Sequence, residues 1–271
     1  MFQTLKRYGS VSIAYLRMSL LTMLEYPANI MGWLLSNPIQ FIVGFATIRF
    51  VVVEFGTIAG WGYGELAFLY GISVISHALN VIFFIQSWHM GYYVIYGDFD
   101  RYMLRPMNIL YQFYFTGFNP IGLTDLIPGI CVFTYGCIQI GFEWSVGNVM
   151  NIILLLIGAT LIRGAVYLII GCTSLWTKSV NSFSGYTQEL FDKTTMYPLS
   201  MYPESFQFVL TYLLPIGWVS FYPAANLLGV PSGKFILNGP VWVTLVVGLI
   251  MFSIAAIIFY RGMKRYESAG S

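Results

Sequence analysis

Charged residues are scarce in this chain of 271 residues. They make up 9% of it and apolar residues 58%, whereas about a quarter of an ordinary soluble domain is charged. The mean hydropathy of +0.73 exceeds what one buried core of this length can hold, so lipid must solvate much of the surface. The composition therefore excludes a soluble globular protein and predicts an all-α polytopic protein of the lipid bilayer.

The excess of one charge sign is also small. The 13 basic and 11 acidic residues leave a net charge of +2. Proteins that bind nucleic acid neutralise phosphates with a dense basic stripe, and this chain cannot supply one. We therefore expect no nucleic acid partner.

Cysteine is rare, and the common catalytic motifs are missing. Cys131, Cys137 and Cys172 lie in apolar runs without CxxC spacing, which argues against a disulfide framework and a zinc site. The chain has no GxxxxGK[ST] phosphate loop, no HExxH helix and no GxSxG elbow. We expect no catalytic residue, metal site or cofactor here, so the chain is not predicted to be an enzyme.

What the chain has instead is a series of long apolar runs. They cover residues 28–53, 63–92, 113–142, 146–176 and 240–260. Each is long enough to cross a hydrocarbon core about 30 Å thick at a rise of about 1.5 Å per residue. These runs predict five membrane-spanning helices.

The region between residues 177 and 239 admits two topologies. Residues 205–228 are apolar but broken by prolines, whereas residues 180–197 contain Glu189, Asp192 and Lys193. In the first topology, 205–228 spans the membrane and 180–197 is a cytoplasmic loop, which hydropathy alone favours. In the second, 180–197 spans with its polar face shielded, and 205–228 forms two short re-entrant helices hinged near Pro215. Both give six crossings.

The first 25 residues predict an amphipathic helix. Their apolar residues recur at steps of three and four, which places them in one stripe. Lys6 and Arg17 fall at the edge of this stripe, where long basic side chains reach phosphate headgroups. Together with Arg7 they are the predicted membrane-interface residues of a helix that lies in the surface of the bilayer.

The distribution of basic residues predicts the orientation. The basic residues near both termini and in two connecting segments fall on one side of the predicted spans. They are Lys6, Arg7, Arg17, Arg101, Arg105, Lys178, Arg261, Lys264 and Arg265. Because basic residues collect on the cytoplasmic side, both termini are expected in the cytoplasm. We expect residues 1–271 to form one multi-pass domain of the cell membrane.

The segment between the second and third spans, GDFDRYMLRP at 97–106, is bounded like a short helix. Asp98 is a good N-cap, and Pro106 disfavours helix at the residue before it, which leaves about two turns. Phe99, Tyr102 and Met103 then share one face, opposite a face with two arginines. Such a helix suits docking into a groove of a soluble partner, although a solvated connecting loop fits the composition equally well.

Two charges fall deep inside predicted spans. Asp125 and Arg163 each lie about 12 residues, or about 18 Å, from the cytoplasmic end of their spans. Unpaired charges at that depth cost several kcal/mol. We expect these two residues to form an ion pair or to share a polar cavity, with His77 of the second span close by.

Three short stretches resemble one transporter family. GDFDRYMLRP (97–106), YPLSMYP (197–203) and LP (214–215) with YPA (222–224) resemble ABC-2 type ABC transporter permeases, in the branch that includes viologen exporters. The resemblance implies an interfacial connecting helix at 1–25, a coupling helix at 98–106 and an outer re-entrant hairpin at 205–228. It favours the second topology.

The resemblance also implies function and partners. The chain would be the permease subunit of an ATP-driven exporter of amphipathic compounds or drugs, paired with an identical or related second permease. ATP and Mg would bind to a separate ABC ATPase, which the coupling helix contacts. The implied coupling residues are Asp98, Phe99, Asp100, Arg101, Tyr102, Met103, Leu104 and Arg105. The alternative is a secondary transporter or channel that works without an ATPase.

Overall fold

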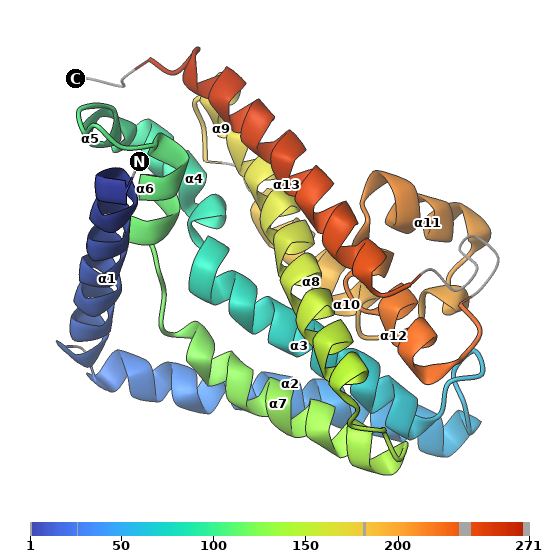
Figure 1. Cartoon of the computed structure of the whole chain (residues 1–271). Helices are drawn as coiled ribbons and strands as arrows, with labels where there is room; N and C mark the ends of the chain where they lie inside the picture. The colour runs from blue at the N-terminus through green and yellow to red at the C-terminus, as the bar shows by residue number, and fades with distance from the viewer. Residues whose placement is uncertain (1, 26, 181–182, 233–239, 268–271) are drawn as a thin grey trace.

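The computed structural model describes residues 2–25, 27–180, 183–232 and 240–267, and these ranges form helices without a strand. About 80% of the protein is helical, as Figure 1 shows. The expected all-α polytopic architecture is confirmed.

Four helical segments in the described ranges are long and apolar enough to cross a membrane. They are α2 (Pro27–Phe55), α3 with α4 (Tyr63–Phe84 and Gln86–Ile95), α8 with α9 (Val146–Cys172 and Ser174–Thr177) and α13 (Trp242–Met263). Each lies within a few residues of a predicted span, because sustained hydropathy marks the interior of a spanning helix more sharply than its ends.

The centre of the fold is a bundle in which small residues let helix backbones approach closely. A Cβ atom on Gly158 of α8 would lie 2.6 Å from the Thr244 carbonyl carbon of α13, and one on Gly71 of α3 would lie 2.5 Å from the Phe133 Cα atom of α7. Close approach at glycine is a common way of packing helices in lipid. A Cβ on Gly164 of α8 would also lie 2.9 Å from the Phe84 ring of α3, so the three contacts together connect α3, α7, α8 and α13.

The expected third span is not one continuous helix. It consists of α6 (Ile109–Thr116) and α7 (Gly122–Gln139), with an irregular break that contains Pro120. Proline removes a backbone donor and clashes with the preceding turn, so a helix breaks there. As a result Asp125 lies in the first turn of α7 rather than in the middle of a straight span.

Neither candidate for the fifth span is a straight helix of spanning length. In the described residues, α10 covers Phe183–Thr194, 12 residues or about 18 Å, which is shorter than the expected span at 180–197. Residues 204–228 form two apolar arms, Glu204–Leu213 and Ile216–Leu228, bent by 77° at a break before Ile216. The first arm contains α11 (Glu204–Phe208) and the second ends in α12 (Phe221–Leu228).

The N-terminal helix α1 (Phe2–Glu25) turns away from α2 and runs across its direction (Figure 1). Several of its large apolar side chains are exposed, including Ile13, Met18 and Leu24. Both ends of the described chain lie near the short helix α5 (Phe99–Met103). One end of the molecule therefore gathers both termini and the segment predicted to contact a partner.

Candidate functional site

The predicted coupling segment forms a single turn of helix, α5, between two residues that fix its ends. Gly97 has a φ of +71°, a conformation that favours glycine, and Pro106 follows the last turn. The helix is shorter than the two turns expected. Asp98 makes no capping hydrogen bond; its Oδ1 lies 3.2 Å from Arg101 Nη2 instead.

The aromatic residues of α5 point into the protein, which corrects the expected docking face. Phe99 and Tyr102 are 0% and 1% exposed. The ring of Phe99 lies 5.5 Å from that of Phe113 and 6.0 Å from that of Phe259 of α13. These side chains are therefore buried in the chain's own helix bundle. An apolar helix face is removed from water in the chain's own core just as well as in the groove of a partner. Phe99 and Tyr102 anchor α5 and are not free to bind another protein.

The exposed apolar residues of the segment lie at its C-terminal end. Leu104 is 86% exposed and Met103 44%, and they are flanked by the exposed Arg101, Arg105 and Pro106. An exposed leucine at the tip of a rigidly anchored turn is available to a partner.

Hydrogen bonds join the segment to two other helices. Arg105 Nη1 donates to the Tyr15 hydroxyl of α1 at 2.6 Å, and the backbone N–H of Asn108 donates to the Tyr8 hydroxyl at 3.1 Å. Tyr260 of α13 donates to Asn108 Oδ1 at 2.8 Å. The residues that follow α5 are thus hydrogen-bonded to both α1 and α13.

Tyr266, just after α13, also packs on this segment. Its ring lies 5.7 Å from that of Phe99. Burial, and after it the nearby charges of Asp100 and Asp98, raises the pKa of the Tyr266 hydroxyl to about 12. This hydroxyl therefore stays protonated at neutral pH.

A second site lies inside the bundle, around Arg163 of α8. This side chain is fully buried. Its Nε donates to Ser76 Oγ at 3.1 Å, and its Nη2 donates to Ser73 Oγ at 2.9 Å and to Thr195 Oγ1 at 3.3 Å. The guanidinium also lies 4.9 Å from the ring centre of Phe191. Arg163 therefore joins α3, α8 and the α10 region.

The acidic partners of this network are linked through His77. Asp192 Oδ1 lies 3.7 Å from Arg163 Nη1 and 3.8 Å from His77 Nδ1. On the other side of the imidazole, His77 Nε2 lies 3.8 Å from Asp125 Oδ2. The Asn37 amide of α2 donates to Asp125. The chain of contacts is therefore Asn37, Asp125, His77, Asp192 and Arg163.

The predicted relation between Asp125 and Arg163 is corrected in detail. They share one polar network, but they do not pair with each other; His77 and Asp192 lie between them. The break before α7 changes the depth of Asp125 relative to the continuous helix that was assumed. Asp192 was not assigned a role from the sequence. A signal was present on α3, where Ser73, Ser76 and His77 recur at helical spacing and form a polar stripe on the face that Asp192 contacts.

A cavity of about 470 Å³ opens beside this network, between α2, α3 and α10. Phe41, Tyr70, His77 and Asp192 contribute to its wall. Within the described ranges, no group of three His, Cys, Asp or Glu residues gathers as a metal site would require. The cavity combines aromatic surface with a few polar groups, the usual make-up of a small-molecule site.

Residues 45–270 match the protein family described as ABC-2 family transporter protein. This match covers most of the chain. The chain belongs to the ABC-2 transporter family. No curated protein and no solved structure matches it.

Family membership establishes the general role of this ABC-2 protein. It is the membrane-embedded permease component of an ABC transporter, so an ABC ATPase and the lipid bilayer are its partners. The viologen-exporter branch remains a prediction. The expected interface residues Lys6 and Arg17 are exposed on α1, and the side chain of Arg7 lies outside the described part of the ABC-2 protein.

Proposed function

We propose that this ABC-2 permease is half of the membrane unit of an ATP-driven exporter. It pairs with a second permease, identical or related, and receives its driving force from separate ATPase subunits, which hold ATP and Mg. Export of an amphipathic compound would follow a path between the two permeases, with the cytoplasmic membrane as its location.

The observation that carries the coupling role is the exposed tip of an anchored segment. Leu104 is 86% exposed. Phe99 and Tyr102, which lie less than two turns before it, are buried and hold α5 in the bundle. Because Arg105 and Asn108 bond to α1 and α13, a push on this tip would move those helices together. Coupling residues from 98 to 105 then divide into a contacting tip and a buried anchor.

The unpartnered face of α2 supports pairing with a second permease. Only 6% of the most apolar stretch of α2 is buried within this chain, against 67% for the stretches in α3 with α4 and α8 with α9. The cavity next to His77 and Asp192 opens between α2 and α10. A second permease on the α2 side would enclose this cavity as part of a shared path.

The position of α10 supports the topology in which it is the fifth crossing. Phe191 and Thr195 are buried against Arg163, which lies far from both ends of α8. The side chains of Glu189 and Lys193 are exposed at the edge of the α2 and α10 cavity and pair with each other at 2.5 Å. A cytoplasmic loop would not reach this depth, so we place α10 in the membrane, the bent pair at 204–228 at the outer surface, and both termini in the cytoplasm.

The test is co-purification of the permease with candidate ABC ATPases, followed by measurement of ATP hydrolysis. Leu104→Asp should abolish association, because it places a charge at the apolar contact. Val146→Asp is the matched control, since Val146 is also 86% exposed but begins α8 at the other end of the bundle. Normal association and hydrolysis with Leu104→Asp would overturn the docking assignment.

Asp125, His77 and Asp192 form a row of contacts inside the bundle, and this row favours one alternative function, an ion-coupled secondary transporter. Rows of titratable groups inside the membrane are typical of ion-coupled secondary transporters. Such a transporter would move substrate in vesicles that contain this chain alone and carry a pH gradient. We expect no transport there without an ATPase and ATP; transport under those conditions would overturn the proposed function.

A further inference from the structure

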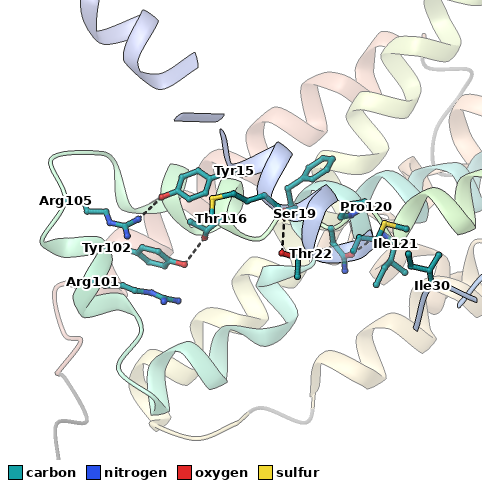
Figure 2. A pocket seen from close by; sticks show the side chains of 14 residues that line it. Tyr15, Ser19, Thr22, Ile30, Arg101, Tyr102, Arg105, Thr116, Pro120 and Ile121 are labelled. Atoms are coloured by element: carbon teal, nitrogen blue, oxygen red, sulfur yellow. Dashed lines mark hydrogen bonds between the residues drawn. The ribbon is translucent and has the colours of Figure 1, made fainter. Parts of the chain in front are cut away.

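A cavity of about 520 Å³ lies between α1, α5 and the break that separates α6 from α7. Figure 2 shows it from close by. Its size falls within the range of small-molecule sites. It is distinct from the cavity beside Asp192. The exposed Leu104 does not line it, whereas the anchoring residue Tyr102 does.

One end of this cavity is basic. Arg101 and Arg105 both line it, and its described lining contains no aspartate or glutamate. Arg105 donates one N–H to the Tyr15 hydroxyl. Arg101 pairs with Asp98, which does not line the cavity. A guanidinium carries five N–H donors in a planar fork that matches the oxygens of a phosphate. The two side chains therefore offer further donors to an anion.

The other end is apolar and is built by helices that reach the membrane. Ile30 comes from α2, Ile121 is the residue before α7, and Met23 lies near the end of α1 that leads into α2. In Figure 2 Ile30 and Ile121 lie at the side opposite Arg105. Hydroxyl groups of residues such as Thr22 and Thr116 lie between the two ends. The wall thus changes from cationic to apolar along the cavity.

We propose that this cavity binds an anionic phospholipid of the cytoplasmic leaflet. Arg101 and Arg105 hold its phosphate, and the start of an acyl chain lies along Met23, Ile30 and Ile121. A free phosphate would leave the apolar end without a partner, and an uncharged lipid would leave the two guanidinium groups unused. The assignment of the leaflet rests on the cytoplasmic placement of α5 in the proposed function.

The bound lipid would link α1 to α5 in addition to the Arg105 and Tyr15 hydrogen bond. Basic residues near the cytoplasmic surface are attracted to anionic lipid, and an amphipathic helix such as α1 lies at that depth. The composition of the leaflet would then affect how firmly the coupling segment is held to the N-terminal helix.

The experiment uses the full-length permease purified in detergent without an ATPase, so its failure is separate from a failure of the coupling proposal. Native mass spectrometry measures retention of phosphatidylglycerol and of phosphatidylcholine, added at equal concentrations. We expect selective retention of phosphatidylglycerol, weakened about thirtyfold by the double variant Arg101→Gln with Arg105→Gln. The matched control is Arg261→Gln with Arg265→Gln, which removes two exposed charges that do not line the cavity.

Two further measurements test the lipid itself. Met23→Trp fills the apolar end and should weaken retention of phosphatidylglycerol while the basic end is intact. Glycerol phosphate, which has the headgroup chemistry without a chain, should compete poorly. Equal retention of phosphatidylcholine, effective competition by glycerol phosphate, loss of retention in the control variant, or unchanged retention in either cavity variant would each overturn the proposal.

Discussion

The helices α2 and α8 are both long and apolar, and they differ in their surroundings. They have 29 and 27 residues, and both are long and apolar enough to cross a membrane. Yet 6% of the most apolar stretch of α2 is buried, compared with 67% of that formed by α8 with α9. Hydropathy therefore identifies a helix that fits a membrane but does not reveal whether lipid, another helix or another subunit covers it.

The difference between the two helices lies in small residues and polar groups. On α8, Gly158, Gly164 and Gly171 each meet atoms of another helix so closely that a Cβ could not fit without movement. On α2, a Cβ on Gly32 would meet nothing within 4 Å. The other glycine of α2, Gly44, does come close to α3, but a Cβ there would meet the hydroxyl end of the Tyr70 side chain rather than a helix backbone. Close approach of two helix backbones at glycine marks a helix fixed inside the bundle, and neither glycine of α2 makes one.

The largest expected effect comes from filling the closest contact of α8. Gly158→Leu should destabilise the protein by more than about 3 kcal/mol, or prevent folding, because the added carbons meet the backbone of α13, which cannot move aside. Gly32→Leu should change the stability little. Thermal unfolding in detergent and the yield of monodisperse protein measure both.

Equal losses in the two glycine variants would show that α2 is packed as tightly as α8. A stable Gly158→Leu protein would contradict the close approach of α8 and α13. Either result would remove the distinction between the two helices.

The second prediction concerns the charge that α8 buries. Arg163→Met should cost about 2 kcal/mol, because it leaves the hydroxyls of Ser73 and Ser76 and the carboxylate of Asp192 without their partner. The partial exposure of Asp192 keeps the cost below that of a fully buried pair. Arg49→Met on α2 is the matched control, since Arg49 is exposed.

Unfolding midpoints of both arginine variants, together with hydrogen exchange of residues 183–194, measure this effect. Faster exchange in α10 is expected only for Arg163→Met. If Arg49→Met costs as much, the network does not hold α10 against the bundle.

The apolar runs predicted most of the helices, whereas contacts between distant residues could not be predicted. The spans built on α2, α8 and α13 were found to within a few residues because a continuous apolar run is a local property. The break around Pro120 was missed because the apolar run resumes on both sides of it, despite Asn119 directly before the proline. Asp192 was left unassigned because its partners, Arg163 and His77, are far away in the sequence and meet it only in the fold.

The candidate coupling residues illustrate the same limit. A short helix with Phe99 and Tyr102 on one face looks the same in sequence whether that face binds a partner or the chain's own core. Only the packing against Phe113 and Phe259 decides between them. Leu104 was among the implied coupling residues, and its place outside the aromatic face could have singled it out as the exposed member of that set.

The third prediction tests how α1 is held. Tyr15→Phe removes the hydroxyl that accepts from Arg105, and the expected cost is about 1 kcal/mol or less, the usual value for one exposed hydrogen bond. Tyr186→Phe, at an exposed tyrosine of α10, should have no effect. Hydrogen exchange of residues 8–25 is the measurement, and unchanged exchange in Tyr15→Phe would contradict the link between α1 and the coupling segment.

The smallest expected effect is near the C-terminal end of α13, where an exposed ion pair joins Lys178, after α9, to Glu267, after α13. Lys178 Nζ lies 2.6 Å from Glu267 Oε2, and the hydrogen bond from Lys178 lowers the pKa of the Glu267 carboxyl. A lowered pKa in the folded state means that this stabilisation is present above the ordinary glutamate pKa of about 4.3 and is lost as the pH falls below it. Hydrogen exchange of residues 264–267, measured from pH 6 to about pH 3 and compared at each pH with Glu267→Gln, should show protection that disappears at low pH only in the original protein. Because exposed pairs contribute little, the difference should be confined to this segment; a change in global unfolding would mean that this end belongs to the tightly packed bundle rather than to its edge.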